Sequence, residues 1–372
     1  MSDADATRSE AMRSFLSEAG WQDAKREPLP GDASSRTYIR VVKAGRSAML
    51  MDQPQQAETP LAGAGATPEE RRQLGYNAVA RLAGADCARF IAMAAHLRAA
   101  GLAAPEVYAA DTKNGFLLLE DFGDNLYADA LVSGADETEL YATAVDALIA
   151  IHNEPAPVAP GGIPLFDYDE TALLGEIDLL TEWYLPMALG RPIELDEQIE
   201  HRNLWRSTLA RVLADSRVFV HRDYHAQNLI WMPKRHGIAR VGMVDFQDAV
   251  AGHPAYDLIS LLEDARRDVS PALADAMTAH YLARSSLRSN REAFLSATAI
   301  FAAQRNAKII GIFSRLAKRD GKPRYLNHLP RVWRYMERDL ENPALENLKT
   351  WYERIVPRET RLATLRGQGE RR

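Results

Sequence analysis

Two short stretches of the chain carry side chains that could transfer a phosphoryl group. The first reads His221-Arg222-Asp223 and reaches Asn228 five residues later, in a loop behind the apolar run 217–220. The second places Asp245 at the end of the run 238–244. Transfer from ATP needs a carboxylate that accepts the proton of the attacking hydroxyl or orients it, and hard oxygen ligands for magnesium beside the phosphates. Asp223 is therefore the predicted base, and Asn228 and Asp245 are the predicted metal ligands.

The order of the two stretches strengthens this interpretation. The spacing H-R-D-x-x-x-x-N followed by D-F-x is the pattern of kinase catalytic and metal loops. A single aspartate in a loop more often caps a turn. Both stretches occur here in the right order, each beside an apolar run, which favours a kinase site over turn chemistry.

Composition sets outer limits on the class of protein. The chain has 372 residues, 47% hydrophobic and 26% charged, which is typical of a soluble globular enzyme large enough for two lobes. A net charge of −6 argues against nucleic-acid binding, and a single cysteine, Cys87, excludes an internal disulfide. The first ten residues do not resemble a signal peptide, and no apolar run is long enough to span a bilayer. We therefore expect a cytoplasmic protein that binds no membrane and needs no obligate protein partner.

The first part of the chain is expected to form a small sheet that covers a nucleotide. The run Gly31-Asp32-Ala33-Ser34-Ser35-Arg36 lies between a short strand and the clear strand 37–43. Small residues between two strands allow close approach of the backbone to phosphate, although such a run alone would more often be a plain hairpin turn. Upstream of the catalytic loop, Gly31, Asp32, Ser34, Ser35 and Arg36 become the predicted nucleotide contacts.

The next strand lacks a lysine that protein kinases use to hold the phosphates. It carries Met49, Leu50 and Met51, and the helix expected at 86–100 has no glutamate to pair with such a lysine. Because the lysine and the glutamate are both absent, neither leaves an unpaired charge buried in the protein. We expect Arg36 or Arg40 to hold the phosphates instead. Residues 53–84 are predicted to be a mobile insertion, in which 68–82 could alternatively form a helix.

A hinge between the lobes is expected after the strands at 105–110 and 115–119. The run Glu120-Asp121-Phe122-Gly123 would bring backbone groups to an adenine edge there, with Glu120 and Phe122 as candidate contacts, although a simple turn is equally consistent with it. On this basis the N-terminal nucleotide-binding lobe would cover 1–121. The C-terminal catalytic lobe would then cover 122–372.

From residue 136 onwards the pattern is mainly helical. We expect helices at 137–152, at 168–189 with a break at Pro186, at 195–214 and at 292–317. Asp257 is assigned a structural role, either tying the catalytic loop or capping its own helix.

Basic residues concentrate near the C-terminal end of this region. Between residues 301 and 340 there are ten lysines and arginines but only three acidic residues. Such a region beside a kinase site suggests an anionic or neutral acceptor. From chemistry alone, Glu182, Gln247, Arg305 and Lys308 are candidate acceptor contacts, although arginine and lysine on a helix are usually exposed.

Taken together, several stretches resemble the bacterial kinases that phosphorylate N-acetylmuramate and N-acetylglucosamine at the anomeric hydroxyl. These kinases belong to the aminoglycoside phosphotransferase branch of the kinase-like fold. The stretches are Gly31-Asp32-Ala33-Ser34, Leu50-Met51-Asp52, Gly115-Phe116-Leu117-Leu118-Leu119, Val244-Asp245-Phe246-Gln247-Asp248-Ala249, Ile310-Gly311-Ile312-Phe313 and Arg319-Asp320-Gly321-Lys322-Pro323-Arg324-Tyr325-Leu326.

The resemblance implies an α+β, two-lobed protein-kinase-like fold, with a small antiparallel-sheet N-lobe and a mainly helical C-lobe. It also implies ATP with Mg²⁺, and a sugar 1-phosphate product that feeds peptidoglycan recycling. Under it, Asp223 is the base, Asn228 and Asp245 are the metal ligands, and residues 31–35 are the nucleotide loop. The small-molecule substrate would be an amino sugar.

Two alternatives stay open from the sequence. An aminoglycoside kinase or another small-molecule hydroxyl kinase would share the site, but a polycationic drug should prefer an acidic pocket, and the basic stretch argues against it. A non-catalytic nucleotide-binding scaffold would explain the absent lysine. The presence of Asp223, Asn228 and Asp245 together argues for turnover.

Overall fold

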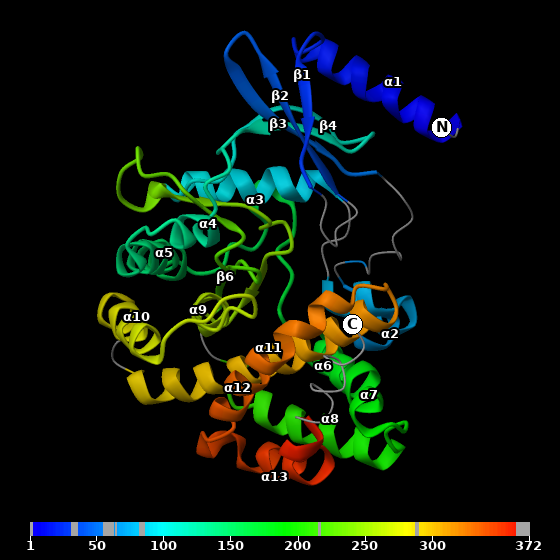
Figure 1. Ribbon diagram of the computed structural model, residues 1–372, viewed down its shortest axis with the longest axis vertical. Helices are drawn as coiled ribbons and strands as arrows, with labels where there is room; N and C mark the ends of the chain where they lie inside the picture. The colour runs from blue at the N-terminus through cyan, green and yellow to red at the C-terminus, as the bar shows by residue number, and fades with distance from the viewer. Residues whose placement is uncertain are drawn as a thin grey trace.

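The computed structural model describes residues 3–30, 36–54, 63, 65–81, 86–214, 217–286 and 290–361. The chain folds into a smaller lobe around one antiparallel sheet and a larger, mainly helical lobe (Figure 1). The predicted α+β, two-lobed architecture is therefore confirmed. The predicted nucleotide loop, Gly31 to Ser35, lies outside the described residues.

Alternating side chains give the sheet of the smaller lobe two buried faces. The strand order is β1 (Lys25–Pro28), β2 (Thr37–Lys43), β3 (Arg46–Asp52), β5 (Phe116–Glu120) and β4 (Val107–Asp111). Leu50 and Leu118 pack with Phe15 of helix α1 (Asp3–Glu18). Met51 and Leu117, which point to the other face because strand side chains alternate, join the core that contains helix α3 (Cys87–Ala99).

The β2–β3 hairpin shows how local sequence sets this sheet. Lys43 pairs with Arg46, so the loop has only two residues, Ala44 and Gly45, with φ of 50° and 75°. Two residues with positive φ form the turn whose twist matches that of the flanking strands. The register then pairs Thr37 with Asp52, at the end of the hairpin opposite the turn.

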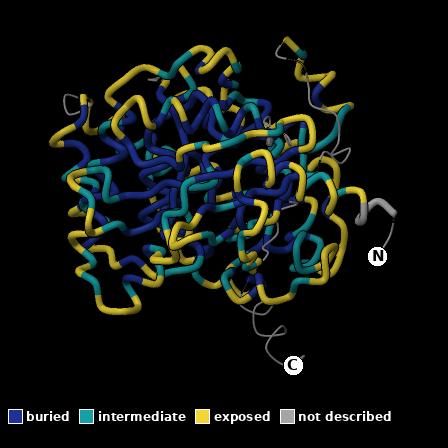
Figure 2. Tube along the Cα trace, turned by 90° about the horizontal axis from the view of Figure 1, so that it is seen from above, coloured by how far each residue is buried: buried dark blue, intermediate teal, exposed yellow. Residues whose placement is uncertain are grey.

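The larger lobe contains most of the helices and two small two-stranded sheets, β6–β9 and β7–β8. Its elements are α4 (Tyr127–Val132), α5 (Glu137–His152), η2 (Pro160–Gly162), α6 (Glu170–Leu179), η3 (Leu180–Tyr184), α7 (Leu185–Leu189), α8 (Leu195–Leu209), β6 (Val218–Val220), β7 (Leu229–Trp231), η4 (Gly237–Arg240), β8 (Val241–Met243), β9 (Val250–Gly252), α9 (Ala255–Leu262), α10 (Pro271–Arg284), α11 (Arg291–Lys318), η6 (Pro323–His328), α12 (Leu329–Asp339), η7 (Pro343–Leu345) and α13 (Glu346–Ile355). Buried segments fill the interior and exposed loops surround them, as Figure 2 shows. None of the described helices combines the length and the apolarity needed to cross a bilayer.

The expected mobile insertion is in part an ordered wall of the larger lobe. Helix α2 (Pro68–Leu74) begins with a capping box, in which Thr67 and Glu70 each bond the other's backbone N–H. The π-helical turn η1 (Asn77–Arg81) follows it and packs against α6. The expectation of a mobile segment was therefore wrong for residues 65–81. The alternative, a helix, holds for 68–74 and 77–81. Figure 1 shows α2 beside α6 and the end of α11.

The helix expected at 168–189 is interrupted before Pro186. Helix α6 ends at Leu179, the π-helical turn η3 follows, and Pro186 stands in the first turn of α7, where a proline is tolerated. Gly311 of α11 explains why this stretch is close-packed, since a Cβ at Gly311 would lie 2.4 Å from the backbone carbon of Leu179. Gly311 therefore lets α11 cross directly over η3.

This close crossing predicts that Gly311→Ala destabilises the protein, although alanine is the better helix former by about 1 kcal/mol. Overpacking against rigid backbone should lower the free energy of unfolding by about 1–3 kcal/mol in guanidinium titrations. Gly65→Ala is the control, because Gly65 is exposed and a Cβ there would meet nothing within 4 Å. Equal stability of the Gly311→Ala variant and the parent would contradict the close crossing.

Candidate active site

The loop that follows strand β6 is fixed to the larger lobe through its backbone. The N–H groups of His221 and Arg222 donate to the two carboxylate oxygens of Asp257, at 2.6 and 2.9 Å. Asp257 lies in the first turn of α9 and is completely buried. Of the two roles expected for Asp257, the structure shows the first: it anchors the loop.

Two residues of the site have a backbone conformation that is unusual for residues other than glycine. The φ angles are 73° at Arg222 and 65° at Asp245. Such a conformation costs about 1–3 kcal/mol and persists only where the surroundings enforce it. At Arg222 the surroundings hold this conformation, because both the backbone N–H and the side chain of Arg222 have buried acidic partners.

A buried carboxylate, Glu176 of α6, joins the loop to the long helix α11. Its Oε1 accepts from Arg222 Nη2 at 2.6 Å and faces Lys308 Nζ at 2.9 Å. Its Oε2 accepts from Gln304 Nε2 at 3.0 Å and from the Tyr168 hydroxyl. Burial raises the pKa of Glu176, but Lys308 and Arg222 outweigh it and lower the pKa below its ordinary value. Sequence analysis missed Glu176, because no local pattern distinguishes it from an exposed helical glutamate.

The predicted base, Asp223, carries a carboxylate that stays ionised. Burial raises its pKa, but neighbouring positive charges, with Lys308 the strongest, lower it to about 2. The carbonyl oxygen of Asp223 accepts from the side-chain amide of Asn228 at 2.9 Å, which closes the loop between them.

The two predicted metal ligands meet at one end of the β7–β8 hairpin. Leu229 pairs with Met243, and one step further the Val244 N–H donates to the Asn228 carbonyl at 3.1 Å. The amide nitrogen of Asn228 donates to the loop, so its amide oxygen is the atom that could bind a metal ion. An amide oxygen and a half-exposed carboxylate are hard donors that Mg²⁺ prefers. These two residues therefore fit a magnesium ion that is bound chiefly through substrate phosphates.

Arg36 contacts the predicted metal ligand Asp245. Its Nη2 donates to Asp245 Oδ1 at 2.9 Å, and Gln247 Nε2 donates to the same oxygen at 2.8 Å. Arg40, the other arginine considered, is instead paired with Asp121 and Asp124. Of the two arginines, only Arg36 reaches the predicted metal site.

Arg89, on the helix α3 that lacks the expected glutamate, anchors this helix to the larger lobe. Its three guanidinium nitrogens donate to the carbonyls of Gln247, Pro164 and Ala249, at 2.9, 2.7 and 2.6 Å. Sequence analysis searched this helix for a glutamate and overlooked the arginine. Its signal was a lone arginine in an otherwise apolar stretch of helix.

The predicted hinge is held by ion pairs and ring contacts. Glu120 pairs with Arg235, whose guanidinium carbon lies 5.0 Å from the centre of the Phe122 ring. The Phe122 ring also fills the space beside Gly242, where a Cβ would lie 2.8 Å from it. The side chains of Glu120 and Phe122 thus shape the hinge, and the backbone between them is what could face an adenine.

The four candidate acceptor contacts do not gather in one place. Lys308 lies beside Asp223, as the effect of its charge on the pKa of Asp223 requires. Glu182 is exposed on η3, and burial followed by Asp178 raises its pKa. Gln247 bonds Asp245 and so belongs to the metal side, while Arg305 is buried and donates to the Glu263 carbonyl at 3.0 Å. The expectation that Arg305 and Lys308 are exposed was wrong.

The expected basic region is largely neutralised by local ion pairs. Arg331 and Arg334 both pair with Asp268, Arg338 pairs with Glu263, and Arg319 pairs with Asp320. The positive charge available to an acceptor is therefore concentrated in fewer groups than the sequence suggests.

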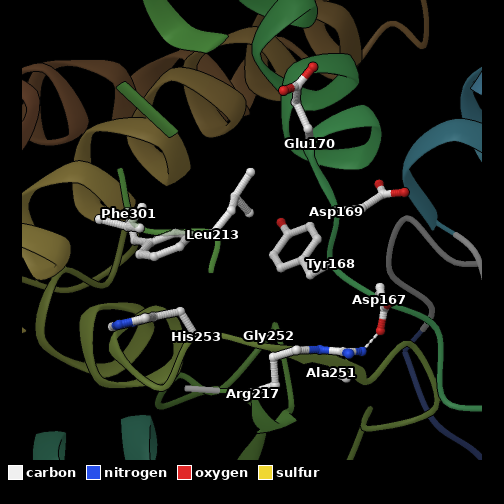
Figure 3. Close-up of a pocket in the computed structure, with 11 residues that line it drawn as sticks. Asp167, Tyr168, Asp169, Glu170, Leu213, Arg217, Ala251, Gly252, His253 and Phe301 are labelled. Atoms are coloured by element: carbon white, nitrogen blue, oxygen red, sulfur yellow. Dashed lines mark ion pairs between the residues drawn. The ribbon is translucent and has the colours of Figure 1, made fainter. Parts of the chain in front are cut away.

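A pocket of about 300 Å³ lies away from this chemistry (Figure 3). It is lined by Tyr168, His253 and Phe301 among others, with the Arg217–Asp167 ion pair at its edge. Tyr168 is the link to the site, because its ring lies 4.9 Å from the guanidinium carbon of Arg222 and its hydroxyl donates to Glu176. The predicted base and metal ligands do not line this pocket, so it is not the catalytic cleft.

Comparison with known proteins agrees with this geometry. Two curated relatives carry the name N-acetylmuramate/N-acetylglucosamine kinase. The one from Caulobacter vibrioides is 47% identical over 95% of this chain and 98% of its own length. The one from Pseudomonas aeruginosa is 35% identical over 87% of this chain and 86% of its own length.

Solved structures show the same fold at low sequence identity. A microcompartment-associated aminopropanol kinase matches with a TM-score of 0.59 and 16% identity, over 91% of this chain and 99% of that one. An aminoglycoside phosphotransferase in a ternary complex with streptomycin and ATP matches with a TM-score of 0.52 and 16% identity, over 88% and 97%. The model of the phosphotransferase enzyme family matches residues 25–294. The chain belongs to the phosphotransferase enzyme family.

Proposed function

We propose that this protein is a cytoplasmic, ATP-dependent kinase that converts N-acetylmuramate, N-acetylglucosamine or both to the 1-phosphate in cell-wall recycling. One observation carries the proposal. An ionised carboxylate, Asp223, lies beside a buried lysine and one loop away from two hard oxygen ligands, in a chain that is 47% identical to a curated kinase of these sugars.

In this proposal Asp223 orients the attacking hydroxyl. With a pKa of about 2 it is ionised at neutral pH and accepts a hydrogen bond from the C1 hydroxyl. A weak base suffices, because phosphoryl transfer passes through a loose transition state in which the nucleophile loses its proton late. Lys308, bonded to Glu176 and close to Asp223, keeps the negative charge on the base.

Asn228 and Asp245 are the proposed ligands of magnesium on the nucleotide side. A bound Mg²⁺ would neutralise charge on the transferring phosphates. Arg36 and Gln247 hold the Asp245 carboxylate in place, and Arg36 would bind the phosphates beside the metal ion. Arg36 thus takes the role of the absent lysine.

The remaining nucleotide contacts are proposed from position in the chain. Gly31, Asp32, Ser34 and Ser35 would cover the phosphates, immediately before Arg36. The backbone from Glu120 to Phe122 would receive the adenine edge. The nucleotide-binding lobe would then end at residue 121, although residues 68–81 pack against the catalytic lobe.

The acceptor is proposed to bind on the side of Lys308, away from Asp245. Glu182 stands at the outer end of this side, while Gln247 and Arg305 would act on the acceptor only through the residues they hold. Positive charge next to the base argues against a polycationic aminoglycoside, which carries several ammonium groups of its own.

The proposal is tested by a magnesium-ATP assay with N-acetylmuramate, N-acetylglucosamine and kanamycin, with phosphorus NMR on any product. An anomeric phosphate on either sugar, with no reaction on the drug, is the expected result. Phosphate on the drug alone would make this an aminoglycoside kinase. Failure to phosphorylate any of the three would remove the proposed substrate class.

Asp223→Ala should lower kcat by about 10²–10⁴-fold and leave nucleotide affinity nearly unchanged, because the carboxylate acts on the acceptor hydroxyl. Turnover is followed by product formation, and nucleotide affinity by calorimetry. Asp275→Ala, which removes an exposed carboxylate of α10, is the control. Near-normal turnover by the Asp223 variant would show that another group orients the hydroxyl.

Lys308→Met should move the acid limb of kcat/KM to higher pH. The positive charge of Lys308 is the strongest of those that lower the pKa of Asp223, and burial acts in the opposite direction. Without that charge the pKa of Asp223 rises, so the base becomes protonated, and inactive, at a higher pH than in the parent enzyme. Lys318→Met, on an exposed position of the same helix, should leave the limb in place. An unmoved limb in the Lys308 variant would contradict the assigned coupling.

A further inference from the structure

Lys308 of α11 is held beside the catalytic loop by a carboxylate that also binds the loop. Its Nζ lies 2.9 Å from Glu176 Oε1, and the same oxygen accepts from Arg222 Nη2 at 2.6 Å. Arg222 immediately precedes the proposed base, Asp223. One carboxylate oxygen therefore joins the lysine ammonium to the side chain of the residue next to the base.

A second contact ties Lys308 to the same loop. Its Nζ donates to the Tyr256 hydroxyl at 3.2 Å and lies 5.7 Å from the centre of the Tyr256 ring. The next residue of α9 is Asp257, whose carboxylate accepts from the backbone N–H groups of His221 and Arg222. The ammonium is therefore held between α6 and α9, the two helices that fix the catalytic loop.

These two contacts leave one N–H group of the Lys308 ammonium unused. An ammonium carries three N–H donors, and the residues that the structure describes accept two of them, at Glu176 and Tyr256. Glu176 takes no further donor, because its two oxygens already serve four side chains. The Lys308 side chain is 12% exposed, so it is not sealed in the interior.

The carboxylate of Asp223 is the complementary group. Asn228 and the His225 N–H both donate to the backbone carbonyl of Asp223, and no described residue donates to its carboxylate. Lys308 is the strongest of the cations that lower the pKa of Asp223, so the two groups lie within electrostatic range. An unpaired carboxylate and a spare ammonium N–H therefore lie near each other without forming an ion pair.

We propose that Lys308 is a catalytic residue, which donates its third N–H to the oxygen of the reacting sugar hydroxyl while that hydroxyl donates to Asp223. A hydroxyl has one donor and two acceptor lone pairs, so it can satisfy both groups at once. This rests on the proposed function and deepens it, because it names the acceptor atom that the lysine contacts.

The contact strengthens as the phosphoryl group is transferred. The hydroxyl oxygen forms a bond to the γ-phosphorus, the bond from that phosphorus to the departing oxygen of ADP breaks, and the hydroxyl proton passes to Asp223. Negative charge that develops on the attacking oxygen is stabilised by a positioned ammonium. Lys308 keeps its own protons throughout, since Glu176 stabilises its charge.

The kinetic test separates this contact from the effect of Lys308 on the charge of Asp223. The parent and Lys308→Met are compared at a pH above the acid limb of both enzymes, where Asp223 is ionised in each. There kcat of the variant should still be about 10–10²-fold lower, because a hydrogen bond from a charged donor is lost. Equal kcat values would show that Lys308 acts only on the charge of Asp223 and would refute the inference.

Lys308→Arg covers the case in which Lys308→Met fails to fold, which circular dichroism would show. Arginine keeps a positive charge beside Glu176, so the acid limb should stay in place. Its planar guanidinium cannot replace a compact ammonium at a positioned contact, so kcat should fall although the limb is unmoved. A kcat like that of the parent would contradict a specific N–H contact.

Binding measurements identify the acceptor atom. Calorimetry with a non-hydrolysable ATP analogue compares the sugar that the parent phosphorylates with its 1-deoxy analogue, which lacks the reacting hydroxyl. The parent should prefer the sugar at least about tenfold. This preference should shrink in Lys308→Met and be kept in Lys318→Met, on an exposed position of the same helix. An unchanged preference in Lys308→Met would refute the contact with the hydroxyl.

The outcomes distinguish this inference from the proposed function. If the parent enzyme phosphorylates neither sugar, the proposed function fails. If it phosphorylates at least one, and the Lys308 variants keep the kcat and the sugar preference of the parent, the function stands and the lysine contact is refuted.

Discussion

The buried carboxylate of Glu176 is the interaction on which the active site depends. Placing an ionised carboxylate in a protein interior is costly unless every lone pair finds a donor. Here Arg222, Lys308, Gln304 and Tyr168 supply those donors. The same four contacts join the catalytic loop, the long helix α11 and the segment before α6. Removing one partner would leave a buried charge uncompensated, at a cost of about 3–5 kcal/mol, so the elements are held as a unit.

The network also sets the charge of the catalytic group. Lys308 is shared between Glu176 and Asp223, and Arg222 is held by Glu176 through its side chain and by Asp257 through its backbone. One carboxylate thus fixes the two cations that keep Asp223 ionised. Because Arg222 also donates to the Ala80 carbonyl, the ordered end of the insertion belongs to this network. A segment that separates strand β3 from helix α3 in sequence therefore supports the catalytic loop in space.

The sequence predicted the parts of the site that follow one another along the chain. Asp223, Asn228 and Asp245 could be proposed because their spacing is short, and Asp257 because an aspartate at a helix start needs a partner. Sequence analysis missed Glu176, Arg89 and Tyr76, because each of these side chains interacts with a residue more than 45 positions away in the chain. The sequence could have predicted that residues 65–81 are ordered. Thr67 and Glu70 form a capping box, and Pro68 stands in the first turn of the helix. The sequence could not have predicted that this segment packs on α6, because that packing depends on the absence of a side chain at Gly175.

Arg89 anchors helix α3 to the loop after Asp245 through contacts unlike the lysine–glutamate pair of protein kinases. A lysine–glutamate pair can open and re-form, because each ion can find water or another partner. Arg89 is 2% exposed and serves three carbonyls at once. Opening this joint would leave a buried cation and the carbonyls of the buried residues Gln247 and Ala249 unpaired, at a cost of about 1–3 kcal/mol for each group. Helix α3 and the loop after Asp245 therefore move as one body. The loop that follows the proposed metal ligand Asp245 is thus anchored to α3 through its own backbone carbonyls.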